Sequence, residues 1–168
     1  AYLQENFGGR IGTRVSSPLA VAEELAGADL AILAVLVPGY AAPKVVTRPM
    51  VRSMGEGAVL VDVSIDQGGA SETSRPTSHS APTYVEEGVV HYCVTNMPGA
   101  VPQTSTQALT SATLPYVEAL ADYGIEGALR RDRALAEALS TYGGALIAGP
   151  VAEDFGMAAV PNPFLPGS

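Results

Sequence analysis

Three short apolar runs in the first 100 positions have the pattern of strands that are buried on both faces. They span Leu30–Val37, Ala58–Val63 and Val89–Val94. A run without alternation of polar and apolar residues is typical of parallel strands covered by helices. Helices are predicted in front of the first two runs, at Pro18–Ala26 behind a Ser17 cap and at Arg48–Met54 behind Thr47. This alternation predicts an α/β fold with an open parallel sheet.

Helical spacing dominates the second half of the chain. Apolar residues recur at steps of three and four from Thr104 to Tyr123, and Pro115 is expected to kink this helix or to mark its restart. A second helix is predicted around Leu135 and Leu139, with Asp132 as its cap. The remaining predictions are a strand at Ala145–Ala148, a short helix at Val151–Phe155 and a loose, proline-rich tail at Pro161–Ser168.

The segments that follow the three predicted strands are expected to meet. They are Val35–Gly39, Ser64–Gly69 and Thr95–Gly99, and each contains Gly or Pro. In a parallel sheet all strand C-termini lie at one edge, where ligands bind. Glycine there lets the backbone approach a flat ligand closely. The long polar loop Ser71–Pro82 lies between the last two segments, and loops of this length often serve function.

Four side chains near this edge are candidates for chemistry, each with a structural alternative. Asp66 follows a buried strand and precedes two glycines, so it could polarise a water or hold an amine, or merely close a turn. Asn96 could contact a ligand or form an Asx turn. Arg75 could bind a phosphate or carboxylate, or stay solvated. Asp62 lies inside a strand, so a structural role is predicted for it.

Composition excludes several classes of function. The 168 residues include 17 acidic and 9 basic side chains, for a net charge of -8, which disfavours nucleic acid as a partner. The single cysteine, Cys93, excludes an internal disulfide. With no signal peptide and no long apolar stretch, a cytoplasmic protein without membrane contact is expected. His79, His91 and Cys93 do not have a metal-site spacing.

The phosphate-binding motifs of nucleotide enzymes are missing from the sequence. Gly55-Glu56-Gly57 lacks the third glycine of the dinucleotide fingerprint and precedes a strand instead of following one. From the residues alone, the chain is therefore predicted to be the second half of a nucleotide-binding α/β fold.

Five long stretches resemble alanine dehydrogenases, in the order and with the spacing of that family. They read VLVPGYAAPKVVTRPMV, GAVLVDVSIDQGG, SRPTSH, YCVTNMPGAVPQTSTQALTSATLPYV and LSTYGGALIAG. The resemblance implies an NAD-dependent enzyme that interconverts L-alanine with pyruvate and ammonia. It implies a partial Rossmann-type parallel sheet in residues 1–103, the second part of the NAD-binding domain. Residues 104–168 would be a linking helix and C-terminal helices that return to an absent catalytic domain.

The same resemblance assigns roles to residues. Asp66 would be the catalytic aspartate beside the reacting carbon. Val35 and Leu36 would flank the adenosine of NAD, and Asn96 and Met97 would approach its nicotinamide. The implied NAD site consists of Ser16, Val35, Leu36, Val63, Ser64, Ile65, Asp66, Arg75, Val94, Thr95, Asn96 and Met97.

The departures from the family pattern limit what this chain is expected to do alone. The family's acid/base His and the Lys and Arg that grip the substrate lie in a preceding domain, outside this sequence, as does the glycine motif. The chain is therefore expected to be an incomplete enzyme that is inactive alone. The resemblance also implies that the complete enzyme is a homo-hexamer. Some members bind magnesium through a Glu and a His on the long helix, but Glu118 is followed by Asp122 and Tyr123, so no metal is predicted.

The NAD-binding subunits of nicotinamide nucleotide transhydrogenases are similar as well. In those proteins the segment that matches Ile65–Gly69 reads more like AQNGG, without the aspartate. The alternative hypothesis is an NAD-binding module of this kind, without amino-acid chemistry. A third hypothesis is a remnant with a structural role only.

Overall fold

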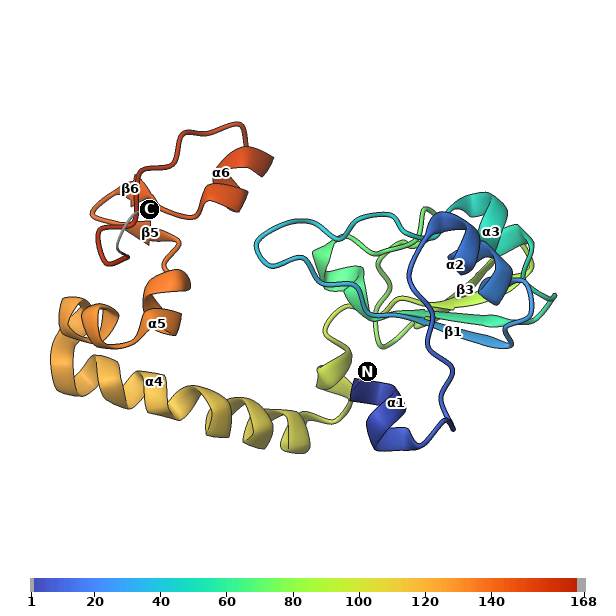
Figure 1. The fold of residues 1–168 in the computed structure, drawn as a ribbon, viewed down its shortest axis with the longest axis horizontal. Coiled ribbons are helices and arrows are strands. Elements are labelled where there is room, and N and C mark those ends of the chain that lie inside the picture. Colours follow the sequence, from blue (N-terminus) through green and yellow to red (C-terminus); the bar gives the residue numbers. More distant parts are fainter. Residues whose placement is uncertain (1, 166–168) are drawn as a thin grey trace. The chain divides into compact units, whose positions relative to one another are not determined.

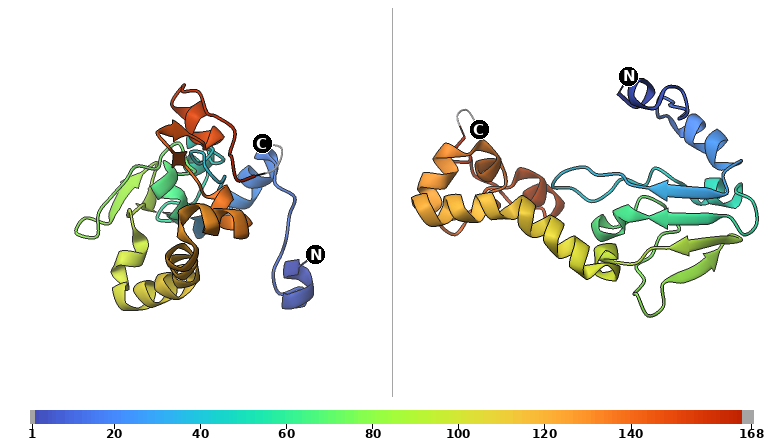
Figure 2. Two further views of the ribbon diagram at one scale, coloured as in Figure 1. Left: turned by 90° about the vertical axis from the view of Figure 1, so that its left-hand side faces the viewer. Right: turned by 90° about the horizontal axis from the view of Figure 1, so that it is seen from below.

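A four-stranded sheet organises the first half of the chain in the computed structural model, which describes residues 2–165 (Figure 1). Its strand order is β1-β2-β4-β3, with bounds Leu30–Leu33, Val59–Asp62, Val89–Tyr92 and Thr83–Glu86. The first three of these pair in parallel, and β3 pairs antiparallel with β4. The strands lie side by side in Figure 2. The predicted parallel α/β sheet is confirmed, although each of its strands is shorter than predicted.

Strand β3 is an addition that was not predicted from the sequence. It joins β4 through a two-residue turn, Glu87-Gly88, in which both residues have positive φ, 54° and 79°. Such turns match the right-handed twist of paired strands, so they close hairpins well. The preceding Ser71–Pro82 segment holds only isolated bridges, among them Thr77 with Val94, and is the predicted loop.

Helices precede β1 and β2, as predicted. Helix α2 spans Pro18–Leu25, and the Ser17 hydroxyl accepts a hydrogen bond from the Ala20 amide at 3.1 Å, which confirms the predicted cap. Helix α3 is a short Arg48–Arg52. The buried cluster between helices and sheet contains Leu25, Ala31, Leu33, Val46, Val51, Met54, Ala58, Leu60, Ala70 and Val89.

The first strand differs from its prediction, because β1 is buried on one face only. Ala31 and Leu33 are buried, whereas Leu30 is 54% exposed and Ile32 is 61% exposed. The continuous apolar run predicted burial of both faces. β1 is an edge strand of the sheet, and the residues that the structure describes cover only the Ala31 and Leu33 side.

The chain divides into two compact units. The first contains the residues up to Val37 and those from Ala41 to Met97, and the second contains Pro38–Tyr40 and the residues from Pro98 onward. Helix α1, Tyr2–Phe7, belongs to the first unit. No helix in the described part of the chain is both long and apolar enough to cross a membrane.

The long helix α4 spans Pro102–Arg131 and is interrupted once (Figure 1). Gly124 has φ 66° and ψ 173°, a conformation that is essentially restricted to glycine. Pro115 was predicted to kink this helix or to mark its restart, but the only non-helical backbone angles within α4 are at Gly124, directly after Tyr123, where the predicted helix ends. Apolar residues of α4 such as Leu109 and Val117 are exposed, at 65% and 57%.

The rest of the second unit consists of short elements. Helix α5, Arg133–Glu137, begins behind Asp132, whose carboxylate accepts from the amides of Ala134 and Leu135, which confirms that cap. The other elements are β5 at Thr141–Tyr142, β6 at Ala145–Leu146 and α6 at Gly149–Asp154.

The proline-rich tail is not loose where the structure describes it. The Asn162 side chain is buried and donates to the Ala136 carbonyl at 2.8 Å, and Phe164 packs edge-on against Tyr142. Residues 166–168 of the predicted tail lie outside the described residues.

A cluster of ion pairs ties the β3–β4 hairpin to α3, and its pH dependence is testable. Arg52 and Arg48 both donate to Glu87 and lower the pKa of its carboxyl from 4.5 to about 2. The folded chain keeps this group charged in acid that protonates it in the unfolded chain. Its contribution to stability is therefore full above pH 4.5 and is lost as the pH falls from 4.5 towards 2.

We expect Glu87→Gln to destabilise the chain at pH 7 and to lose this effect in acid. Urea unfolding of both proteins at intervals from pH 7 to about pH 2.5 measures the difference. A gap between the two midpoints that stays constant over this range would show that the ion pairs do not stabilise the hairpin.

Candidate functional site

The ends of β1, β2 and β4 come together as predicted, and we call residues 35–36, 63–66 and 94–97 the strand-end cluster. The Ser64 hydroxyl donates to the Val35 carbonyl at 2.9 Å and accepts from the Val35 amide at 2.8 Å. The Asp66 carboxylate accepts from the Asn96 amide at 3.0 Å. Two hydrogen-bonded junctions thus join the three segments through side chains of the middle one.

Asp66 lies on η1, a 3-10 helix at Val63–Gln67 that is capped by Asp62. Asp62 is fully buried and accepts from the Ser64 amide, the Ala70 amide and the Ser74 hydroxyl, at 3.0, 2.8 and 2.5 Å. Three donors on one carboxylate fold the segment back on itself. The structural role predicted for Asp62 is confirmed.

Two glycines close this turn. Gly68 has φ 94° and Gly69 has φ 79°, in the region that residues with a side chain rarely adopt. A Cβ on Gly69 would lie 2.9 Å from the Ser74 Cβ and 3.0 Å from an Asp62 carboxylate oxygen. The backbone conformation therefore explains why both positions of the IDQGG motif are glycine. The turn leaves the Asp66 side chain exposed.

Lys44 holds the same turn from outside the cluster. Its ammonium donates to the carbonyls of Gly68 and Gly69 at 2.6 and 2.7 Å. Lys44 was not among the residues predicted for the site, because the contact joins positions 24 and 25 residues apart. No local pattern signals such a pair.

Asn96 adopts φ 51° in the turn that follows β4, four residues after Tyr92. Its amide donates to Asp66, and its carbonyl lies 3.0 Å from His79 Nε2, which is the donor of that bond since the carbonyl can only accept. His79 was considered only as a metal ligand, and no group of three potential metal-ligating side chains occurs among the described residues. The exposed Asp66 carboxylate remains able to take up a proton or to hold an amine.

Arg75 lies above an aromatic ring. Its guanidinium carbon is 3.8 Å from the centre of the Tyr84 ring, and its amide donates to the Tyr84 hydroxyl at 2.9 Å. Burial raises the pKa of the Tyr84 phenol, so this group stays protonated and donates to the Thr73 carbonyl at 2.8 Å. His91 and Cys93 are fully buried below it, as the structural interpretation of both predicted.

The other predicted residues differ in what they present. Ser64, Ile65 and Val94 are buried, so they offer backbone groups, whereas Leu36 and Val63 are exposed apolar side chains. Thr95 is exposed, and Met97 is half-buried at the start of η2, Met97–Ala100. Ser16 is not in the strand-end cluster: it lines a groove of about 410 Å³ between α2 and β1.

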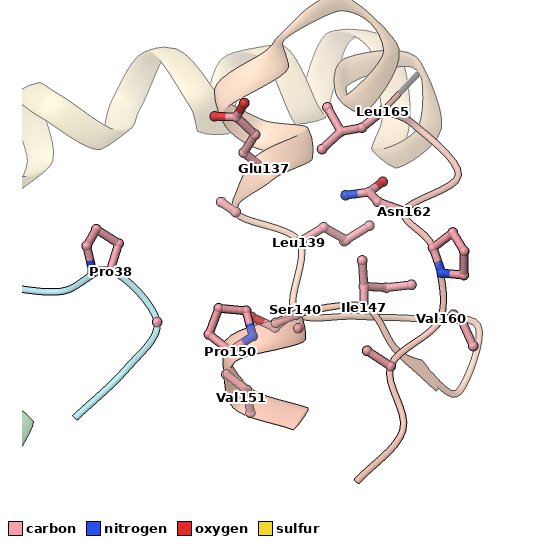
Figure 3. Close-up of a pocket in the computed structure, with 16 residues that line it drawn as sticks. Pro38, Glu137, Leu139, Ser140, Ile147, Pro150, Val151, Val160, Asn162 and Leu165 are labelled. Atoms are coloured by element: carbon pink, nitrogen blue, oxygen red, sulfur yellow. The ribbon is translucent and has the colours of Figure 1, made fainter. Parts of the chain in front are cut away.

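A separate cavity of about 700 Å³ lies in the second unit (Figure 3). Ile147, Pro150 and Val160 are among its mainly apolar walls, and Glu137 contributes a carboxylate at its rim. None of the residues of the predicted NAD site lines it. All of the predicted site residues lie in the first unit instead.

Comparison with known proteins gives one consistent result. The family described as "Alanine dehydrogenase/PNT, C-terminal domain" matches residues 1–149. The alanine dehydrogenase of Halomonas elongata is 56% identical over 155 residues, which are 92% of this chain and 42% of that protein. The chain thus spans about two fifths of the length of the relatives that it matches.

Solved structures agree with this result. A structure of L-alanine dehydrogenase superimposes with a TM-score of 0.78 and 49% identity, covering 92% of this chain and 43% of that one. A transhydrogenase from Sinorhizobium meliloti superimposes with a TM-score of 0.63 and 25% identity, covering 88% of this chain and 40% of that one. The chain therefore belongs to the alanine dehydrogenase/PNT family and carries its C-terminal domain.

Proposed function

We propose that this chain is the C-terminal part of an NAD-dependent alanine dehydrogenase, which converts L-alanine, NAD and water into pyruvate, ammonia and NADH, reversibly. The observation that carries the proposal is the exposed Asp66 carboxylate, which is held at the strand-end cluster by the Asn96 amide. The family match and the 56% identity to an alanine dehydrogenase support the same reaction.

The residues of the strand-end cluster fit a dinucleotide. Leu36 and Val63 offer exposed apolar surface for flat rings. In the turn after β2, Gly68 has no side chain, so a ligand can approach the backbone closely there. In the proposal Val35 and Leu36 flank the adenosine, and Asn96 and Met97 approach the nicotinamide. The remaining contacts come from Ser16, Val63, Ser64, Ile65, Asp66, Arg75, Val94 and Thr95. NAD, when bound, accepts the hydride from the substrate carbon.

Asp66 is proposed to act as the general base and acid beside that carbon. Once the hydride leaves, the substrate carbon is bonded to a positively charged imine nitrogen, which a nearby carboxylate stabilises. Water then adds to the carbon. Asp66 takes one of the two water protons, and the other passes to the nitrogen, which departs as ammonia and leaves the carbonyl of pyruvate. In the reverse direction the same carboxylate returns the proton.

The proposal extends to the organisation of the whole enzyme. Residues 1–103 are assigned to the NAD-binding domain and residues 104–168 to the linking helix and the return to the catalytic domain. The exposed apolar side chains of α4 and the exposed face of β1 support this assignment, since each lacks cover among the described residues. We propose a cytoplasmic homo-hexamer that acts in amino-acid catabolism, in which this part alone is inactive.

Binding of NADH to the purified chain tests the cofactor assignment. We expect NADH fluorescence to rise on titration with the chain and to saturate, and AMP to compete. A chain that folds but leaves NADH fluorescence unchanged would contradict the proposal.

The second candidate is an NAD-binding module of the transhydrogenase kind, without amino-acid chemistry. The similarity to the Sinorhizobium meliloti transhydrogenase supports it. Both candidates bind NADH, but only the first requires the Asp66 carboxylate, so replacement of Asp66 separates them.

A further inference from the structure

We propose that Tyr84 is a positioning residue that presents the Arg75 guanidinium to a phosphate group of the dinucleotide. This inference rests on the proposed function, because it names how one side of the proposed NAD site is built. Tyr84 lies on β3, a strand that contributes no residue to the predicted NAD site.

Three planar groups form a column from the core to the surface. The Arg75 guanidinium lies over the Tyr84 ring at 3.8 Å, and the Tyr84 ring stacks on His91 with centroids 4.9 Å apart and planes 20° apart. Two hydrogen bonds also fix the Tyr84 hydroxyl, one from the Arg75 amide and one to the Thr73 carbonyl. Tyr84 therefore holds both the backbone and the side chain of the 73–75 segment.

The base of the column is rigid. His91 is fully buried, and its two ring nitrogens lie 2.8 Å from the Thr73 hydroxyl and 2.9 Å from the Val89 carbonyl. The Val89 carbonyl can only accept, so Nδ1 is the donor of that bond, and the Thr73 hydroxyl pairs with Nε2. With both nitrogens engaged, the ring below Tyr84 has a single orientation.

The column ends beside the strand-end cluster. Ser74 donates to Asp62 at the end of β2, and the Thr77 amide donates to the Cys93 carbonyl at the end of β4. Arg75 lies between these two anchors, so its segment crosses the strand ends where the dinucleotide is proposed to bind.

Arg75 has the chemistry of an anion site. Five arginines in the described residues pair with glutamates, namely Arg14, Arg48, Arg52, Arg130 and Arg133. Among the same residues Arg75 has no carboxylate partner, and its guanidinium makes a cation–π contact with the Tyr84 ring. A guanidinium over a ring face keeps its N–H donors available, and their fork matches the oxygens of a phosphate group.

A double-mutant cycle on the full chain tests the proposal, with NADH affinity measured for wild type, Arg75→Met, Tyr84→Leu and the double variant. Arg75→Met is expected to weaken binding about tenfold, since it removes a charge-assisted contact. Tyr84→Leu is expected to weaken it about three- to tenfold through the lost platform. In the Arg75→Met background, Tyr84→Leu should change the affinity by less than about twofold.

The contrary result is a Tyr84→Leu loss of the same size in both backgrounds, which would show a general structural role and overturn the proposal. Tyr84→Phe covers the possibility that the leucine variant does not fold. It keeps the ring under the guanidinium and removes only the hydroxyl bonds, so a loss of affinity smaller than that of Arg75→Met is expected. A loss as large as that of Arg75→Met would contradict a platform made by the ring.

A second readout does not depend on NADH. The Arg75 Nε–Hε resonance, assigned by its absence in Arg75→Met, should show the ring-current shift of a stacked guanidinium and should move on titration with inorganic pyrophosphate. If wild type binds no NADH, the proposed function fails, whereas a pyrophosphate response that Tyr84→Leu abolishes still supports the column. If the Nε–Hε resonance shows no ring-current shift, or does not move on titration with pyrophosphate, this inference is overturned, whatever the NADH affinity.

Discussion

Asp66→Asn is expected to lower alanine-dependent turnover by about 10²- to 10⁴-fold, the usual contribution of a positioned acid or base. The measurement requires an active context, because the chain spans 42% of its Halomonas elongata relative. A chimera in which this chain replaces the matching C-terminal part of that alanine dehydrogenase provides one. Reduction of NAD in the presence of L-alanine then reports turnover directly.

The substitution is chosen to separate chemistry from geometry. The new amide oxygen can still accept from the Asn96 amide, so the junction between the two strand ends is preserved. NADH affinity is therefore expected to change by less than about threefold, which is close to the weakest net contribution of a hydrogen bond. Turnover that survives the substitution would remove Asp66 from the reaction and favour the transhydrogenase-like candidate.

Asp62→Asn is expected to destabilise the first unit by about 3–5 kcal/mol, a large part of the stability of a small domain. The carboxylate is fully buried and accepts from Ser64, Ala70 and Ser74. An amide in its place turns one acceptor into a donor that faces other donors. Each buried donor left without an acceptor costs about 1–3 kcal/mol.

Urea unfolding followed by circular dichroism measures this loss. Asp122→Asn is the matched control, since Asp122 is exposed on α4 and the same change there is expected to cost less than about 0.5 kcal/mol. Equal unfolding free energies for the two variants would mean that Asp62 does not hold the turn that carries Asp66.

Local patterns in the sequence were sufficient for the elements with local causes. The caps at Ser17 and Asp132 each act within three residues, so both could be predicted. Buried apolar runs identified three strands. Because parallel strands end at one edge of a sheet, the same runs also predicted that Asp66 and Asn96 lie close together.

What escaped prediction depends on contacts between distant positions or on cover from outside. Lys44 reaches Gly68 and Gly69 across 24 and 25 residues. The contacts of Tyr84 depend on β3, a short strand that runs into the turn at Glu87 and Gly88 and was not predicted. Proline is a strong helix-breaking signal in sequence, so Pro115 was predicted to kink or restart the long helix, yet the only non-helical backbone angles within α4 are at Gly124. Burial of β1 was overestimated, because an apolar run shows what a strand can bury but not what covers it.

The most direct test that this chain belongs to an alanine dehydrogenase is NADH oxidation by the chimera with pyruvate and ammonium, beside the parent enzyme. We predict turnover within about tenfold of the parent, because the chain supplies a strand-end cluster with an intact Asp66. A chimera that folds and binds NADH but fails to oxidise it with pyruvate and ammonium would contradict the assignment of this chain to an alanine dehydrogenase.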